Sequence, residues 1–264
     1  FRRSRGLGDV YKRQDIGFRF LFSRELLSIS THSAVSFNKV PFQSQIMCLY
    51  FMDLKVDKKI ALIKERLSDK SFLGGWSSQK KMAVIPINSL TEKAFIAPEN
   101  AKQASVAIIL FEEKNDLYFY LTKRTSEVEH HKGQVSLPGG AIDKNETPVD
   151  ASIRESYEEI GVDGSYLELL GKLSNFYTPV SYFNIHPFIW YSKSKPKINI
   201  NLQEVEEVYK VSVSELVNEK NVKTTNVEKS GVNFKVSSFN FNDCVCWGAT
   251  AMILSELKDL ILDL

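Results

Sequence analysis

One segment of the chain, GAIDKNETPVDASIRESYEEIGV at residues 140–162, contains a helix whose two ends can be read from the residues themselves. Thr147 is a preferred N-cap residue, Pro148 falls at the first helical position, and Asp150 is placed for a capping box. Gly161 is the residue type that most often ends a helix. The sequence therefore predicts a helix over residues 148–160.

Three acidic residues of this helix share one face. At about 100° per residue, Glu155, Glu158 and Glu159 fall within about 100° of one another. The far side carries the apolar residues that we expect to pack on a sheet: Val149, Ile153, Tyr157 and Ile160. Like charges three and four positions apart each destabilise a helix by about 0.2–0.5 kcal/mol. A divalent cation with oxygen ligands, Mg²⁺ or alternatively Mn²⁺, would remove that repulsion, whereas a solvated acidic face is the plainer alternative.

The rest of the chain alternates strand and helix patterns. Apolar alternation predicts strands at 105–111, 117–124, 166–173, 184–192, 205–213 and 232–241, with a hairpin turn at 114–116. A short helix should start at Ser214, and an amphipathic helix should close the chain from Ala249. Interleaved elements of this kind favour an α/β fold of the α+β type, with a mixed β-sheet sandwiched between α-helices.

Residues 1–51 do not resemble the start of a folded domain. They lack a clear periodicity, and the string DVYKRQ resembles a translated sequencing-library adapter. We therefore expect a non-native or disordered leader at 1–51 and a folded domain at 52–264, beginning at Met52. An organelle-targeting segment, rich in Arg and Ser, is the alternative.

Composition excludes several classes of function. The net charge of +2 gives no support to nucleic-acid binding, and no apolar run is long enough to span a bilayer. The three cysteines are too few for a disulfide framework and fit a reducing, cytoplasmic environment. Cys244 and Cys246 have no partner cluster that would make a zinc site, so we expect them to be core residues.

The fixed positions in residues 140–162 carry a resemblance to a known family. Gly140, five residues, Glu146, seven residues and then Arg154 with the segment RESYEEIGV match the sequence box of the Nudix hydrolases, with Ser156 at a position that is usually apolar. The resemblance implies the Nudix fold and metal-dependent hydrolysis of a diphosphate. It also implies that Glu155 and Glu159 are the principal metal ligands, with Glu158 as a third ligand or as a partner of a metal-bound water.

Further roles follow from the same resemblance. Arg154 is expected to pair with Glu146 and steady the loop, while Glu155 and Glu158 are expected to act in catalysis. Glu204, from a later segment, is the candidate for an additional catalytic acid, as base or further metal ligand, and a solvated acid at a strand end is the alternative. Glu206 and Glu207 are expected to be surface residues.

The stretch YLTKRTSEVEHHKGQVSLPGG, residues 120–140, resembles the accessory motif of the coenzyme A diphosphatase branch of that family. It departs from the motif at Tyr120, Thr125, Glu129 and Leu137. Segments 177–189, 204–216 and 247–254 resemble the same branch, with Tyr182 where the branch has glycine. The expected substrate-binding residues are Arg124, His131, Gly133, Gln134, Gly139 and Gly140; surface histidine is the alternative for His131.

The branch implies a substrate. Coenzyme A and its derivatives would be cut at the diphosphate to give 3′,5′-ADP and a 4′-phosphopantetheine fragment. The alternatives are a Nudix hydrolase of another nucleoside diphosphate derivative (ADP-ribose, NADH or a dinucleotide) and a non-catalytic binding module of the same fold. The expected partner is thus a small molecule, with no nucleic acid and no membrane, and a homodimer is possible.

Overall fold

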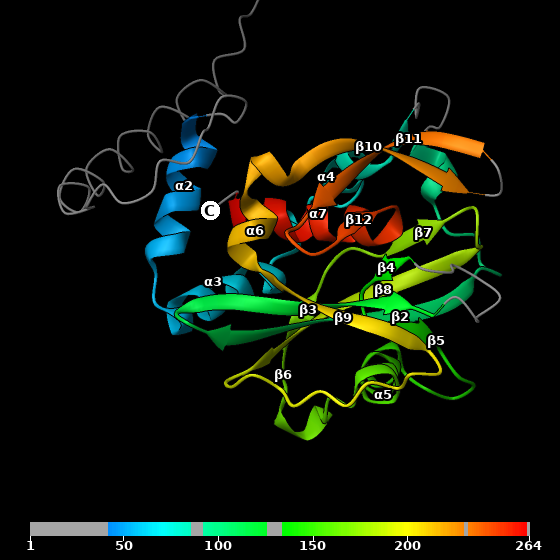
Figure 1. The fold of residues 1–264 in the computed structure, drawn as a ribbon, viewed down its shortest axis with the longest axis horizontal. Helices are drawn as coiled ribbons and strands as arrows, with labels where there is room; N and C mark the ends of the chain where they lie inside the picture. Colours follow the sequence, from blue (N-terminus) through cyan, green and yellow to red (C-terminus); the bar gives the residue numbers. More distant parts are fainter. Residues whose placement is uncertain (1–41, 86–91, 126–133, 230–231, 263–264) are drawn as a thin grey trace, which may run out of the picture. The chain divides into compact units, whose positions relative to one another are not determined.

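The structure is a computed structural model that describes residues 42–85, 92–125, 134–229 and 232–262 (Figure 1). Most of the expected leader, residues 1–41, lies outside this part of the chain. Helix α2 (Phe42–Asp53) crosses the expected domain start at Met52, and Phe51 is a buried core residue. The folded unit therefore includes residues on the N-terminal side of Met52.

A mixed sheet of eight strands forms the centre of the fold, as predicted. Its strands are β2 (Lys102–Glu113), β3 (Asp116–Arg124), β4 (Val135–Ser136), β5 (Gly139–Ala141), β6 (Glu168–Lys172), β7 (Phe176–Thr178), β8 (Phe183–Ser192) and β9 (Val205–Ser212). β2 and β8 run parallel, and the other pairs are antiparallel. The long central strand β2 therefore touches β3, β5 and β8.

The predicted turn at 114–116 joins β2 to β3. Lys114 and Asn115 both have positive φ angles, 52° and 64°, and Glu113 pairs with Asp116 across the turn. Two central residues in the left-handed region define the turn that suits the twist of a hairpin. The prediction is confirmed.

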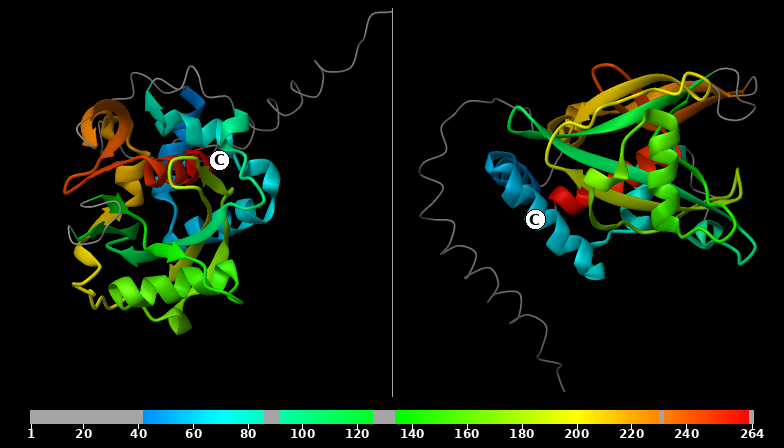
Figure 2. Two further views of the ribbon diagram at one scale, coloured as in Figure 1. Left: turned by 90° about the vertical axis from the view of Figure 1, so that its right-hand side faces the viewer. Right: turned by 90° about the horizontal axis from the view of Figure 1, so that it is seen from below.

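Helices cover both faces of this sheet. Ala107, Ile109 and Phe111 of β2 face helix α5 (Pro148–Ile160), whereas the alternate residues Ile108 and Leu110 join the larger core with helix α7 (Ala249–Leu262). In Figure 1 α5 lies below the sheet and α7 above it, and the right-hand view in Figure 2, seen from below, shows α5 lying across the strands. The sheet is thus the middle layer.

The remaining helices pack beside α7 and at the ends of strands. They are α3 (Val56–Ser68), α4 (Trp76–Gln79) and α6 (Val213–Val217), with short 3₁₀ helices at Lys70–Phe72, Lys80–Met82, Glu92–Phe95, Gly164–Tyr166 and Glu219–Asn221. The short helix expected from Ser214 begins one residue earlier, because Ser212 caps it and Glu215 completes the capping box.

A second sheet, which the sequence did not indicate, lies above the first. Its strands are β1 (Val84–Ile85), β10 (Val222–Lys229), β11 (Val232–Asn240) and β12 (Val245–Trp247), all antiparallel. Only β11 was predicted. The described side chains of β10 are exposed or half-buried, so its sequence, VKTTNVEK, carries no apolar alternation.

Helix α7 corrects one prediction. The predicted helix from Ala249 is present, but it is not amphipathic in its burial, because almost every side chain from Ala251 to Leu262 is buried. Glu256 is fully buried and accepts hydrogen bonds from the Gly75 backbone N–H (2.9 Å) and from Gln79 Nε2 (3.1 Å). Glu256 therefore holds the segment that contains Gly75 and Gln79 against α7 instead of facing solvent.

The packing face of α5 corrects a second prediction. Tyr157 is 62% exposed, whereas Ser152 and Ser156 are fully buried. The Ser156 hydroxyl donates to the Ser152 backbone oxygen (2.7 Å), and Trp190 Nε1 donates to Ser152 Oγ (3.1 Å). Small hydroxyl residues can therefore enter the helix–sheet interface because their polar atoms are paired.

Replacement of Glu256 by alanine should destabilise the fold, because it leaves buried donors without an acceptor. We expect Glu256→Ala to lower the free energy of unfolding by about 3 kcal/mol in urea denaturation. Lys81→Ala is the control, since it removes the more exposed Lys81–Asp259 pair (2.5 Å) from the same region and should cost no more than about 1 kcal/mol. Equal losses in the two variants would contradict the anchoring role of Glu256.

Candidate functional site

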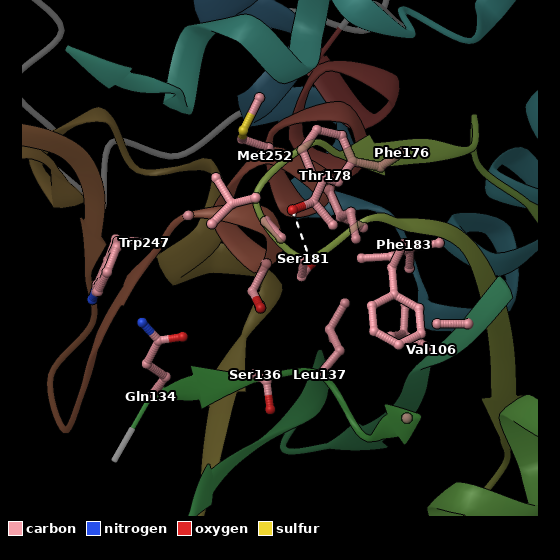
Figure 3. A pocket seen from close by; sticks show the side chains of 18 of the residues that line it. Val106, Gln134, Ser136, Leu137, Phe176, Thr178, Ser181, Phe183, Trp247 and Met252 are labelled. Carbon is pink, nitrogen blue, oxygen red and sulfur yellow. Dashed lines mark hydrogen bonds between the residues drawn. The ribbon is translucent and has the colours of Figure 1, made fainter. Parts of the chain in front are cut away.

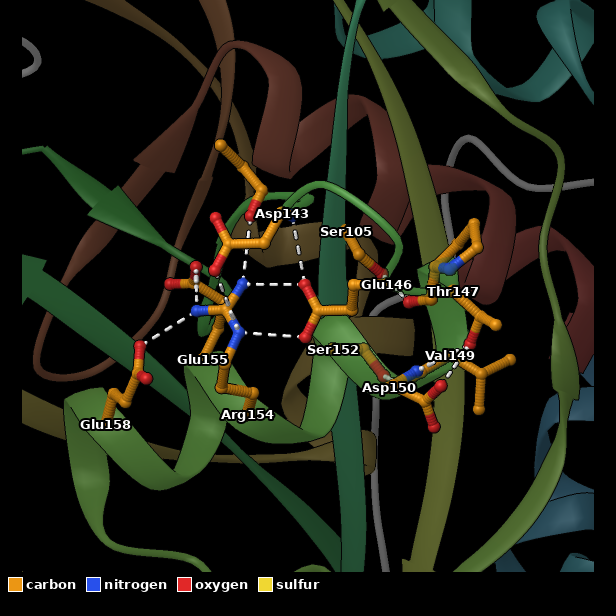
Figure 4. A network of polar contacts seen from close by, with 12 residues as sticks. Ser105, Asp143, Glu146, Thr147, Val149, Asp150, Ser152, Arg154, Glu155 and Glu158 are labelled. Atoms are coloured by element: carbon orange, nitrogen blue, oxygen red, sulfur yellow. Dashed lines mark hydrogen bonds and ion pairs between the residues drawn. The ribbon is translucent and has the colours of Figure 1, made fainter.

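Arg154 is the centre of a network of acidic residues (Figure 4). Its guanidinium group donates two hydrogen bonds to Glu146, from Nε to Oε1 (2.8 Å) and from Nη2 to Oε2 (3.0 Å). Nη1 donates to Glu155 (2.8 Å) and to Glu158 (2.9 Å), and Nη2 also donates to the Ala141 backbone oxygen (3.0 Å). The bidentate pair joins the loop after β5 to α5.

The helix ends that position these groups are formed as predicted. Thr147 Oγ1 accepts from the Asp150 backbone N–H (3.2 Å), and Pro148 is the first helical residue. Gly161 adopts the left-handed conformation that ends the helix, with φ 70° and ψ 18°. Because both ends are fixed, the rotational positions of the acidic residues are fixed as well.

The three acidic residues of the box differ in exposure. Glu158 is 48% exposed, Glu155 is 14% exposed and Glu159 only 1%. Glu159 lies between helix and sheet, where the Gly139 backbone N–H donates to its Oε2 (3.2 Å) and Arg124 Nη1 lies 3.7 Å from its Oε1. The prediction that all three project away from the sheet is therefore wrong for Glu159.

Burial changes the electrostatics of two of these groups. Desolvation raises the pKa of Glu159 to about 8, against the lowering influence of Arg124 and the Gly139 N–H. Desolvation also raises the pKa of Glu155, although Arg154 opposes it. Charge on Glu204 contributes to both shifts. The sequence-predicted acid from the later segment thus lies close enough to influence both carboxylates.

Strand β5 supplies two glycines where no side chain would fit. A Cβ at Gly140 would lie 2.4 Å from Glu155 Oε2, and one at Gly139 would lie 2.3 Å from the Ser105 backbone oxygen. Contacts this short are forbidden to real side chains. Gly140 therefore lets the Glu155 carboxylate approach the backbone, and Gly139 lets β5 pair closely with β2.

The acidic residues suit a divalent cation by their chemistry. Among the described residues no three acidic, histidine or cysteine side chains already converge at metal-ligand spacing. In this structure the carboxylates of Glu155 and Glu158 both accept hydrogen bonds from Arg154. However, Glu159 is buried and Glu155 is half-buried, and burial raises the pKa of both carboxyl groups, so a bound cation would stabilise their charged forms. Oxygen ligands with unbalanced negative charge are what Mg²⁺ and Mn²⁺ select, so the residues fit such an ion.

A cavity of about 1100 Å³ opens beside these acidic residues. Four of the residues predicted to bind substrate line it together with Glu155: Arg124, Gln134, Gly139 and Gly140. Arg124 Nε is buried without a hydrogen-bond partner among the described residues. As the cationic residue of the cavity lining, Arg124 offers a guanidinium group of the kind that binds phosphate or carboxylate. The predicted His131 and Gly133, and the divergent Glu129, lie outside the described residues.

The loop between β7 and β8 forms part of the cavity wall. Tyr182 has a positive φ of 61°, in the conformation that suits the glycine expected there. Its hydroxyl donates to Asn100 Oδ1 (2.7 Å), and its ring meets Tyr177 edge to face at 5.9 Å. These contacts offset a backbone strain of roughly 1–3 kcal/mol, so the loop keeps its shape with a large residue.

Sequence reasoning missed most of the cavity. Figure 3 shows Phe176, Phe183, Trp247 and Met252 around it. These residues carry no sequence signal of their own, because an apolar residue of a cavity wall and one of a packed core have the same pattern.

The buried charge of Glu159 should make the metal-free protein sensitive to pH. Because the folded-state pKa is raised, the stabilising contribution is present at low pH and is lost as pH rises through about 8. In a chelating buffer, the melting temperature should fall by several degrees between about pH 5 and about pH 9. Glu159→Gln should flatten this decline, whereas Glu158→Gln, at a half-exposed position, should leave it unchanged. A wild-type decline that persists in Glu159→Gln would contradict the assignment.

Comparison with known proteins agrees with this geometry. Residues 101–229 match the NUDIX domain family model. Nudix hydrolase 3 of Caenorhabditis elegans is 28% identical over 157 residues, covering 53% of this chain and 65% of that protein. Nudix hydrolase 15, mitochondrial, of Arabidopsis thaliana is 33% identical over 161 residues, covering 58% of this chain and 56% of that protein. The matched region thus spans less than two thirds of either relative.

A bacterial relative and a solved structure extend the comparison. The uncharacterized Nudix hydrolase NudL of Enterobacter sp. (strain 638) is 28% identical over 159 residues, covering 60% of this chain and 82% of that protein. The crystal structure of the Nudix hydrolase RenU from M. smegmatis superposes with a TM-score of 0.38 at 20% identity, covering 45% of this chain and 78% of that one. The part of the chain at residues 101–229 is thus similar to a Nudix domain, and the relatives that match this chain are named as Nudix hydrolases.

Proposed function

We propose that this protein hydrolyses the diphosphate bond of coenzyme A and its derivatives, giving 3′,5′-ADP and 4′-phosphopantetheine, in a reaction that depends on Mg²⁺ or Mn²⁺. The observation that carries the proposal is the position of Arg124. This residue lines the same cavity as Glu155, and its Nη1 lies 3.7 Å from Glu159 Oε1, which provides a guanidinium donor for phosphate beside the acidic residues. The accessory motif at residues 120–140 supports coenzyme A over other diphosphates.

The side chains suggest a division of roles. Glu155 and Glu159, with Glu158 as a third group, would hold the metal, and the bound ion would neutralise negative charge on the diphosphate oxygens. Arg124 would donate to a phosphate oxygen. Arg154 and Glu146 do not face the cavity, and they would act by holding the loop and the helix at a fixed distance.

Hydrolysis also needs a group that accepts a proton from the attacking water. Glu204 is the proposed base. Its backbone oxygen accepts from the Thr125 N–H (3.0 Å), which fixes it beside the end of β3, and Asn201 Nδ2 donates to its carboxylate (3.3 Å). Water would attack phosphorus, its proton would pass to Glu204, and the bond to the bridging oxygen would break.

A cytoplasmic location and a possible homodimer are parts of the same proposal. All three cysteines are free, and no described helix has the length and apolar content needed to cross a membrane. Gel filtration of the full chain measures the oligomeric state directly.

A substrate panel tests the proposed reaction. The full chain is incubated with Mg²⁺ and coenzyme A, NADH, ADP-ribose or a dinucleoside polyphosphate, and products are identified by mass. We expect coenzyme A to be cut most efficiently, to 3′,5′-ADP and 4′-phosphopantetheine, and Glu155→Gln to lose most turnover while staying folded. If another compound of the panel is cut more efficiently, the substrate belongs to the class of that compound and is not coenzyme A. If the compounds bind but none is cut, the protein is a non-catalytic binding module.

Replacement of Glu204 separates a base from a surface acid. Glu204→Gln should lower turnover by about 10²-fold or more at neutral pH, because the proton acceptor is lost. Glu206→Gln is the matched control two residues away, since Glu206 pairs with Lys123 (2.7 Å) at the surface, and it should keep wild-type turnover. If both variants lose turnover to the same small extent, Glu204 is not the catalytic base.

A further inference from the structure

The cavity beside the acidic residues is divided by polarity. Among its described lining residues only Arg124 and Glu155 carry charge, and both belong to the end formed by the box and β5. The rest of the lining is largely aliphatic and aromatic, including Val106, Phe176 and Phe183. A diphosphate needs only the charged end, which leaves the apolar chamber to a group that the diphosphate carries.

Much of the chamber is built by segments outside the matched Nudix domain. Ala83, Ala94 and Phe95 come from the N-terminal side of residue 101, and Val236 with residues 247–250, 252 and 253 comes from the C-terminal side of residue 229. Phe95 is tied to the rest of the fold by stacking on Trp76 at 4.1 Å and by its contact with Phe176 at 6.3 Å. The flanking segments thus supply a preformed wall.

Several hydroxyl groups of the chamber bond to one another. Thr178 Oγ1 and Ser181 Oγ lie 3.0 Å apart (Figure 3), and Ser136 Oγ lies 3.2 Å from Thr122 Oγ1. Because these groups already have partners, an apolar ligand would not leave them unsatisfied. A hydrogen-bonding ligand would have to compete for them.

We infer that the chamber binds an apolar acyl or alkyl group carried by the diphosphate substrate, and that Ala94 and Ala249, on its two flanking walls, determine how long that group can be. The inference rests on the proposed function for the identity of the charged end. A cavity of about 1100 Å³ exceeds the range of roughly 300–1000 Å³ that is usual for a drug-sized ligand. The volume therefore accommodates a substrate with a sizeable apolar arm.

A binding experiment tests the apolar arm without hydrolysis. S-acetyl, S-butanoyl and S-octanoyl pantetheine, which lack the diphosphate, are titrated calorimetrically into the full chain in the presence of a chelator. Burial of a methylene group strengthens binding by about fourfold at most, and we expect S-octanoyl pantetheine to bind at least about tenfold more tightly than the acetyl compound. Equal affinities across the series would overturn the inference.

Filling the chamber provides the second test. Ala249→Phe and Ala94→Phe each place a ring on one flanking wall, and Ala249→Ser is the matched control of similar size. Each phenylalanine variant should weaken S-octanoyl pantetheine binding by at least about tenfold relative to Ala249→Ser, with melting temperatures recorded to confirm folding. If the folded phenylalanine variants keep the wild-type chain-length preference, the apolar arm does not occupy the chamber. If a nucleoside competes with S-octanoyl pantetheine for the wild-type protein, the chamber binds the nucleobase of the substrate instead. That result would also overturn the inference.

The two proposals fail in distinguishable ways. If the protein cuts no diphosphate but binds the octanoyl compound with the expected preference, the chamber assignment stands and the hydrolytic function does not. If it cuts coenzyme A but binds the pantetheine series without preference, the hydrolytic function stands and the chamber assignment does not. The ratio of kcat/KM for octanoyl-coenzyme A and coenzyme A, compared between Ala249→Phe and Ala249→Ser, then measures the effect of the chamber on turnover.

Discussion

The close approach of β5 to helix α5 is the constraint on which the candidate site depends. It exists because Gly139 and Gly140 have no side chains: a Cβ at either position would overlap the Ser105 backbone oxygen or the Glu155 carboxylate. With the strand this near, the Gly139 N–H reaches Glu159, and Arg154 reaches the Ala141 backbone oxygen as well as Glu146. The box is thus a single packed unit of loop, strand and helix.

This unit concentrates charge where water is scarce. Glu159 is almost completely buried, and burial raises its pKa to about 8 although Arg124 lies nearby. A structural helix would gain stability from an apolar residue there. The arrangement is intelligible as a site in which the cost of burying carboxylates is offset when a cation binds.

The cavity gives the flanking segments a role beyond support. The N-terminal helices and α7 are anchored to one another through Glu256, which accepts from Gly75 and Gln79. Both flanks also contribute to the cavity wall, through residues such as Phe95 and Met252. Mutations that loosen this anchor should therefore change the shape of the apolar chamber as well as stability.

The sequence by itself determined the local features of this protein. Capping residues and Gly161 defined α5 to the residue, the turn at Lys114 and Asn115 was apparent, and the spacing of Glu155, Glu158 and Glu159 brought the acids together. These features follow from contacts within a few residues of one another, so a local pattern is enough to indicate them.

Only the tertiary structure decided which environment each residue meets. The spacing along the helix placed Glu159 with the other acids. In the structure, however, Ser152 and Ser156 are buried, with Ser152 bonded to Trp190, so Glu159 lies in the interior and Tyr157 is exposed. The second sheet, the burial of α7 and the apolar chamber depend on segments more than a hundred residues apart. Burial, pKa shifts and cavities arise from such long-range contacts, which a periodic pattern within one segment does not predict.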